Sequence, residues 1–221
     1  MKIAILGNGK MGILISKLAI QRGHTIVTVS SSKNPGKDLD LSDTDVAIDF
    51  STPNSAFDNI SHAIKNGIPT ISGTTGWLDK INEIYKLCNK KENGAFLHSS
   101  NFSLGMNMFF KLNKNLAQLM QKKEYNSSIH ETHHKNKLDS PSGTAISLQN
   151  DINSILGEKS KITSERINQI TGTHKVIYSC NEDEIEIKHT AKNRNGFAMG
   201  AVLAAEWIKG KNGVFTLNDI I

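Results

Sequence analysis

A cluster of ionisable side chains lies near the middle of the chain, where His130, His133 and His134 are followed by Lys137. A histidine with an ordinary pKa of about 6.5 can transfer a proton at neutral pH, and a lysine supplies a lasting positive charge. One histidine is therefore expected to act as a general acid beside a bound anion. For His130, which should lie within a strand from Tyr125 to His130, and for Glu131, which could orient a neighbour, we expect structural roles.

The residues that follow predict the start of a helix. Pro141, Ser142, Gly143 and Thr144 precede a run with helical spacing from Ala145 to Leu156, and proline suits the first helical turn. The first amides of a helix have no partner within it, and the helix dipole adds positive potential there. A cationic loop joined to such an anion-accepting start is typical of a pocket for a small acidic molecule.

A metal site is not predicted for the histidines. The zinc-protease pattern HExxH spaces its two histidines four residues apart, whereas His130-Glu131-Thr132-His133 is one residue shorter. No cysteine or further carboxylate lies nearby at ligand spacing.

A glycine-rich turn occurs close to the N-terminus. It lies between an apolar strand from Lys2 to Leu6 and a helix from Ile13 to Gln21, and it reads GxGxxG. In that setting the glycines permit a tight turn and let a pyrophosphate approach the backbone. The alternative is a tight turn without a ligand. The predicted cofactor-binding residues here are Gly7, Asn8, Gly9, Lys10, Met11 and Gly12.

The second strand, Thr25 to Val29, is followed by Ser30-Ser31-Ser32-Lys33. Proteins that prefer NAD carry an acidic residue at this place to bind the ribose hydroxyls. Here Ser31 and Lys33 could instead hold a 2′-phosphate, so we expect NADPH to be used at least as well as NADH. The alternative is that Lys33 is a solvated loop residue.

Strands and helices continue to alternate, which predicts a right-handed, doubly wound parallel sheet. Strands are expected at 46–50, 69–72 and 95–99, and helices at 55–66 and 78–90. Small polar loops follow the strands, at the edge where such sheets bind ligands. Each loop alone could carry small polar residues only because they form turns. One of these loops is Ser51 to Asn54. The loops after the next two strands contain the predicted cofactor-binding residues Gly73, Thr74, Thr75, Ser99, Ser100, Asn101 and Phe102.

The rest of the chain predicts a second α+β domain with a mixed or antiparallel sheet. A helix at 104–120 carries apolar residues at helical spacing, among them Met108, Leu112, Leu116 and Leu119. Its start, with Met106, Met108, Phe109 and Phe110, is expected to belong to the core rather than to a cofactor site. A polar stretch follows the helix at 142–156, and strands at 174–180 and 184–189 form a hairpin. A helix at 197–209 precedes a tail, 214–221, that could rejoin the first sheet or cover its edge. We expect a dinucleotide-binding domain at 1–103, rejoined by about 194–221, and a substrate-binding and oligomerisation domain at 104–193.

Composition is ordinary for a folded globular protein, and its basic balance suits the binding of small acidic molecules. The 221 residues are 38% hydrophobic and 21% charged, and carry a net charge of +5. The lysines are scattered without aromatic or groove-reading elements, which argues against nucleic acid and favours anionic dinucleotides and carboxylates. Cys88 and Cys180 form no CxxC pair and are expected as buried, reduced thiols. No signal peptide or membrane span is predicted, so a cytoplasmic location is expected.

The run from Glu131 to Ala145 closely resembles the E-x-H-H-x-x-K-x-D-x-P-S-G-T-A signature of bacterial dihydrodipicolinate reductases. Similarity extends to Asp49-Phe50-Ser51, Gly73-Thr74-Thr75-Gly76, Asn101-Phe102-Ser103-Leu104-Gly105 and the C-terminal Gly213-Val214-Phe215. The resemblance implies that His133 is the acid–base residue and Lys137 its proton donor, with His134, Gly143 and Thr144 holding the substrate's carboxylates. It also implies a homotetramer built through the sheet of the substrate domain. The acid or arginine often found after the family's second strand is replaced here by Ser30 to Lys33.

The expected function is NAD(P)H-dependent reduction of 4-hydroxy-tetrahydrodipicolinate to tetrahydrodipicolinate, in lysine and diaminopimelate biosynthesis. Two alternatives are open at this point. One is another NAD(P)-dependent dehydrogenase of a small carboxylate, and the other is a non-catalytic dinucleotide-sensing domain. A sensor would not require His133, His134 and Lys137 beside an anion site.

Overall fold

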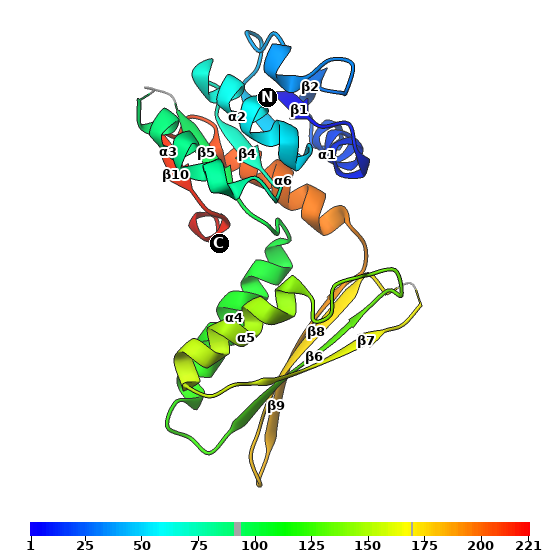
Figure 1. Cartoon of the computed structure of the whole chain (residues 1–221), viewed down its shortest axis with the longest axis vertical. Coiled ribbons are helices and arrows are strands. Elements are labelled where there is room, and N and C mark those ends of the chain that lie inside the picture. The colour runs from blue at the N-terminus through cyan, green and yellow to red at the C-terminus, as the bar shows by residue number, and fades with distance from the viewer. Residues whose placement is uncertain (91–93, 169) are drawn as a thin grey trace. The chain divides into compact units, whose positions relative to one another are not determined.

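The computed structural model describes residues 1–90, 94–168 and 170–221. The chain divides into two compact units, coloured along the sequence in Figure 1. The first unit combines Met1–Leu104 with Asn195–Ile221, and the second is Gly105–Arg194. The first unit is therefore built from two separate stretches of the chain.

The first unit contains a six-stranded parallel sheet, which confirms the predicted doubly wound fold. Its order is β10-β5-β4-β3-β1-β2, and every pairing is parallel. The C-terminal tail rejoins this sheet as its edge strand. The strands are β1 (Lys2–Leu6), β2 (Thr25–Val29), β3 (Val46–Asp49), β4 (Thr70–Ser72), β5 (Ala95–His98) and β10 (Gly213–Phe215).

Helices cover both faces of this sheet. Ile3 and Ile5 pack in the core cluster formed with α1 (Lys10–Gln21) and α6 (Asn195–Ile208). The alternate residues of β1 belong to another cluster on the opposite face. That face carries α2 (Pro53–Lys65) and α3 (Ile81–Lys90), which pack against each other and against the central strands. Three short 3₁₀ helices complete the unit: η1 (Gly36–Asp38), η2 (Leu78–Lys80) and η3 (Leu217–Asp219).

Local signals explain where the helices of the first unit begin. A Cβ atom on Gly12 would lie 1.8 Å from the carbonyl oxygen of Gly7, so the close approach of α1 to β1 requires glycine there. Helix α2 starts at Pro53, earlier than expected, because Thr52 and Ser55 form a capping box and proline suits the first turn.

The second unit contains a four-stranded mixed sheet with the order β7-β6-β8-β9. β6 (Asn126–His133) and β7 (Lys161–Arg166) are parallel, whereas β6 with β8 (Gly172–Ser179), and β8 with β9 (Glu184–Ala191), are antiparallel. Helices α4 (Leu104–Met120) and α5 (Gly143–Leu156) lie side by side on one face (Figure 1), around buried Ile129, Val176 and Tyr178.

Two expectations for the strands of this sheet were wrong. The polar stretch after α5 contains a strand, β7, whose sequence Lys161-Ile162-Thr163-Ser164-Glu165-Arg166 has one apolar residue because it forms a half-exposed sheet edge. β6 continues three residues beyond His130, so His133 is the last residue of a strand and not part of a loop.

The expected core start of helix α4 is confirmed for Met106 and Phe109, which are 3% and 6% exposed, and was wrong for Met108. Met108, Leu112 and Leu119 are 54%, 51% and 72% exposed. The helix carries apolar residues on two faces, so periodicity alone does not decide which face is buried. The buried residues are Met106, Phe109, Asn113, Ala117 and Met120.

Both cysteines are free, but only Cys88 is buried, and Cys180 is half-buried. Among the described helices, none combines the length and the apolar character required to cross a lipid bilayer.

Candidate active site

The glycine turn of the first unit forms an open anion-accepting helix start. Gly9 is the N-cap of α1 and makes no side-chain capping bond, and the first turn holds no acidic residue. The amides of Lys10, Met11 and Gly12 therefore lack helical partners. A Cβ atom on Gly9 would meet nothing within 4 Å, so a ligand can approach its backbone closely.

A cavity of about 400 Å³ lies beside this turn. No lining residue is charged, and several offer hydroxyl or amide groups to a sugar or phosphate. Of the predicted residues, Gly7, Asn8, Gly9 and Ser31 line it, whereas Lys33 is exposed and outside the lining. Gly36 and Asn59 also line the cavity, although neither was predicted as a binding residue. The full lining is Gly7, Asn8, Gly9, Ser30, Ser31, Ser32, Pro35, Gly36, Phe50, Ser51, Thr52, Ser55 and Asn59.

A buried carboxyl group fixes the loops next to this cavity. Asp49, at the end of β3, accepts from the Ser51 hydroxyl at 2.6 Å and from the Ser72 hydroxyl at 2.8 Å. The Ser51 amide donates to Thr74 Oγ1 at 2.9 Å. Burial raises the pKa of Asp49 to about 6, against the lowering effect of these hydroxyls. One side chain thus joins the loops that follow β3 and β4.

The other predicted cofactor residues follow β4 and β5. The Ser99 amide donates to the carbonyl of Ser72, so these two loops are neighbours and bring Gly73, Thr74 and Thr75 near Ser99, Ser100 and Asn101. The side chain of Phe102 is only 2% exposed and packs in the core, 5.6 Å from the ring of Phe50. A ligand can therefore contact Phe102 only through its backbone. The glycine turn, free amides and uncharged cavity together fit a dinucleotide.

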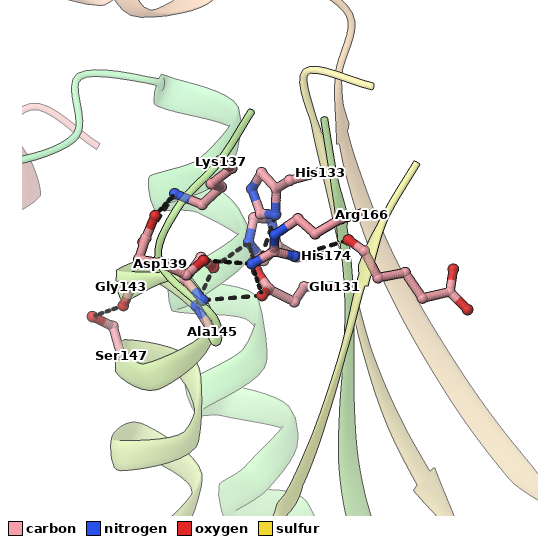
Figure 2. Close-up of polar contacts among 11 residues, drawn as sticks. Glu131, His133, Lys137, Asp139, Gly143, Ala145, Ser147, Arg166 and His174 are labelled. Carbon is pink, nitrogen blue, oxygen red and sulfur yellow. Dashed lines mark hydrogen bonds and ion pairs between the residues drawn. The ribbon is translucent and has the colours of Figure 1, made fainter. Parts of the chain in front are cut away.

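In the second unit, β6 places Glu131 and His133 on one face, because side chains alternate along a strand. Both are buried, at 0% and 7% exposed. Figure 2 shows both side chains converging with His174 and Arg166 near the start of α5.

Glu131 is the centre of this cluster. Its Oε1 accepts from the Ser142 amide at 3.0 Å and from Arg166 Nη2 at 3.1 Å. Its Oε2 lies 3.0 Å from His133 Nδ1 and 3.8 Å from His174 Nε2. Burial alone would raise the pKa of Glu131, but hydrogen bonds, from Ser142 and Arg166 among others, lower it to about 2. The carboxylate is therefore ionised at neutral pH.

The two buried imidazoles pack edge to face, with ring centroids 5.0 Å apart. Burial lowers the pKa of both, for His174 to about 4, so His174 is neutral at physiological pH. For His133, the charge of Glu131 opposes this effect. His174 was not predicted as a site residue, although it falls with Val176 and Tyr178 on the alternating buried face of β8.

The anion-accepting helix start is present, one residue later than expected. Helix α5 begins at Gly143, and the hydroxyl of its N-cap Ser142 accepts from the Ala145 amide at 3.2 Å. Pro141 therefore precedes the first turn. Gly143 is exposed, and a Cβ atom there would meet nothing within 4 Å, whereas Thr144 is half-buried. The Gly143 and Thr144 amides have no partner inside the helix.

The loop before α5 carries the remaining predicted residues. His134 and Lys137 are half-buried, and the Lys137 amide donates to the carbonyl of His134 in a tight turn. Lys137 Nζ lies 2.8 Å from Asp139 Oδ1 (Figure 2), and this contact lowers the pKa of Asp139. Arg166 Nη2 donates to the carbonyl of Asp139, which ties the loop to β7.

Glu131, His133 and His174 each bring one potential ligand atom within 4.8 Å of the others, a spacing that a metal ion could use. The guanidinium of Arg166 already binds the carboxylate, and Lys137 adds positive charge nearby. Because two fixed cations oppose a third, we assign no metal ion to this cluster.

Comparison with known proteins gives the family. Residues 1–102 match the family model described as dihydrodipicolinate reductase, N-terminus, and residues 105–221 match dihydrodipicolinate reductase, C-terminus. The chain is 47% identical over 237 residues to 4-hydroxy-tetrahydrodipicolinate reductase of Christiangramia forsetii, covering 100% of this chain and 98% of that protein. It is 33% identical to the enzyme of the same name from Archaeoglobus fulgidus, with all of both chains covered.

A solved structure shares the fold across the whole chain. Dipicolinate-bound dihydrodipicolinate reductase from Paenisporosarcina sp. TG-14 superposes with a TM-score of 0.84 at 21% identity, covering 100% of this chain and 99% of that one. The two family models together span nearly every residue, and full-length relatives exceed 30% identity. The chain therefore belongs to the dihydrodipicolinate reductase family.

Proposed function

We propose that this protein reduces 4-hydroxy-tetrahydrodipicolinate to tetrahydrodipicolinate with NADH or NADPH, in lysine and diaminopimelate biosynthesis. The observation that carries the proposal is the arrangement in the second unit. A buried histidine with its own ionised carboxylate, His133 with Glu131, lies beside the open start of α5 and a lysine-bearing loop. A site of this kind can bind a dicarboxylate and deliver a proton to it.

When bound, the reduced nicotinamide supplies a hydride to a ring carbon of the conjugated cyclic imine. The reaction consumes one proton and releases the oxidised cofactor, together with water when the hydroxylated form of the substrate enters. The hydride leaves excess electron density on the neighbouring atom of the conjugated system. An acid within hydrogen-bond reach of that atom is therefore required.

His133 and Lys137 are the groups proposed to supply this proton. Lys137 also provides positive charge for a carboxylate, and so does the dipole at the start of α5. The amide of Gly143, the hydroxyl of Thr144 and the ring of His134 are proposed to hold the carboxylates. Asp139 now pairs with Lys137, so an incoming carboxylate would compete with it for the lysine.

The cofactor is proposed to bind along the glycine turn and the loops after β4 and β5. The contacts would come from Gly7 to Gly12 and from the loops 73–75 and 99–102. We also propose that NADPH is used at least as well as NADH, because Ser31 lines the cavity and no carboxylate does. Comparing the Michaelis constants for the two cofactors tests this preference, and a clear advantage of NADH would refute it.

Assembly is a further part of the proposal. One face of the second unit's sheet packs on α4 and α5, while residues such as Lys175 and Ile177 on its other face are only half-buried. We propose a homotetramer formed through this sheet, to be checked by light scattering. A cytoplasmic location accords with the two free thiols of Cys88 and Cys180.

The deciding experiment follows the fall in NADPH absorbance when substrate is generated freshly by a coupled synthase. Oxidation that depends on the synthase supports the proposal. Oxidation only with another small carboxylate would identify a different dehydrogenase. Cofactor binding without any turnover would identify a dinucleotide sensor.

A further inference from the structure

We infer that Glu131 is a positioning residue for the reduction, which holds His133 and the start of α5 in a single arrangement and serves as counter-ion when His133 carries its proton. The inference rests on the proposed function. It gives a specific role to Glu131, a fully buried carboxylate that does not itself bind substrate or cofactor in the proposed function.

The two carboxylate oxygens of Glu131 contact different groups. Oε1 binds the Ser142 amide and the Arg166 guanidinium, at 3.0 and 3.1 Å. Oε2 faces the imidazoles, at 3.0 Å from His133 Nδ1 and 3.8 Å from His174 Nε2. One rigid group therefore connects the acid to the residue that caps the proposed carboxylate-binding helix. A shift of either the acid or the helix start must disturb the other.

This geometry also selects which nitrogen of His133 can react. Nδ1 lies 3.0 Å from Glu131 Oε2 as an ion-pair contact, although neither atom makes a hydrogen bond in this structure, and we assign Nε2 to the substrate. A Cβ atom on Gly172 would come within 3.0 Å of Nε2, so the absence of a side chain at that position keeps space beside the reactive nitrogen. The carboxylate and the glycine act on opposite sides of the same ring.

Glu131 is also the nearest charge that favours a proton on His133. Of the other groups that face the ring, Asp139 favours the charged form, whereas burial, Lys137 and Arg166 oppose it. His174 meets the ring edge to face, is itself neutral, and is influenced in turn by His189 on β9. Without the carboxylate, a buried imidazolium would face mostly positive charge.

His174 packs against the ring of His133 and limits its movement. Its Nε2 lies 3.3 Å from the Ser142 hydroxyl, and its ring packs 5.0 Å from that of His133. Because its pKa is held at about 4, it stays uncharged and does not compete with His133 for the carboxylate at neutral pH. It restricts rotation of the acid without taking part in proton transfer.

The test is Glu131→Gln, which removes the charge but keeps the size and an oxygen for the Ser142 amide. The matched control is Glu165→Gln on β7, an exposed carboxylate that lies 3.5 Å from His130. For each full-length protein, kcat is measured against pH. The pKa of His133 is followed by NMR with labelled histidines, and its signal is assigned with His133→Gln.

In Glu131→Gln we expect His133 to titrate at least about one pH unit lower, and kcat near neutral pH to fall at least about tenfold. The affinity for NADPH should change less than about twofold, and Glu165→Gln should behave as wild type. An unchanged His133 titration together with an unchanged pH profile would overturn the inference. If the wild type fails to reduce the substrate, the proposed function is wrong, yet the NMR titration still decides the role of Glu131.

Should Glu131→Gln not fold, Glu131→Asp provides the second test, because it keeps the charge but withdraws it by one methylene group. We expect it to retain a His133 titration close to wild type and to lose several-fold in kcat through misplacement of the ring. Full kcat in this variant would overturn the positioning role.

Discussion

Replacing His133 with glutamine tests the chemical centre of the site. Glutamine has a similar volume and retains hydrogen-bonding groups, but its amide cannot donate a proton to a carbon or nitrogen of the substrate. The variant also loses the ring that packs 5.0 Å from His174, and it keeps Glu131 beside a neutral partner. The main change is therefore the loss of the acid.

The size of the effect follows from the role. General acid catalysis contributes roughly 10²–10⁴ in rate, which corresponds to about 3–5 kcal/mol of transition-state stabilisation. Because Lys137 lies near His133 and could supply a proton less well, we expect kcat to fall about a hundredfold or more. NADPH binds to the other unit in the proposed scheme, so its dissociation constant should change less than about twofold.

The assay measures NADPH oxidation with freshly generated substrate, and cofactor binding by fluorescence. The matched control is His130→Gln, on the same strand but its opposite face, where Nδ1 lies 2.8 Å from Thr163 Oγ1. This control should keep wild-type turnover. If His133→Gln also kept wild-type turnover, the assignment of His133 as the acid would be wrong.

Three further predictions concern substrate, cofactor and stability. Thr144→Val should raise the Michaelis constant for substrate about tenfold with a smaller change in kcat, since one hydrogen bond to a charged group is lost; steady-state kinetics measure both. Gly12→Ala should abolish NADPH binding measured by fluorescence, because its Cβ would lie 1.8 Å from the carbonyl oxygen of Gly7 and the glycine turn must shift to make room for it. Burial raises the pKa of Asp49 to about 6, so its ionisation costs folding free energy above that pH, and the cost is relieved as the pH falls toward 4. The free energy of unfolding of Asp49→Asn, relative to that of wild type, should therefore rise by about 1–2 kcal/mol from pH 5 to pH 8, measured by urea unfolding. The same difference between variant and wild type at both pH values would contradict this prediction.

Much of the first unit could be predicted because its signals are local. Strands such as β1 are short apolar runs, and helix α1 begins directly after the glycines from Gly7 to Gly12. The second unit has weaker signals. Strand β7 lies at a sheet edge with alternate residues exposed, and helix α4 presents apolar residues on two faces.

The residues of the candidate site also differ in whether a local sequence signal predicts them. His133 and Lys137 stand out because they lie in one short segment with the helix start. Arg166 and His174 reach the site only through strand pairing, in which His133 is opposite Arg166 on β7 and Glu131 is opposite His174 on β8. That register depends on β6 lying between β7 and β8, which no local pattern in the chain specifies.

The discontinuous first unit has a consequence for synthesis. Its edge strand β10 and the buried helix α6 both come from the last stretch of the chain, Asn195–Ile221. On the ribosome, the whole of Gly105–Arg194 must emerge before the nucleotide-binding fold can close its core. Until then the faces of Ile3, Ile5 and Leu97 that α6 will cover are exposed to water, a period in which a nascent chain would benefit from a chaperone.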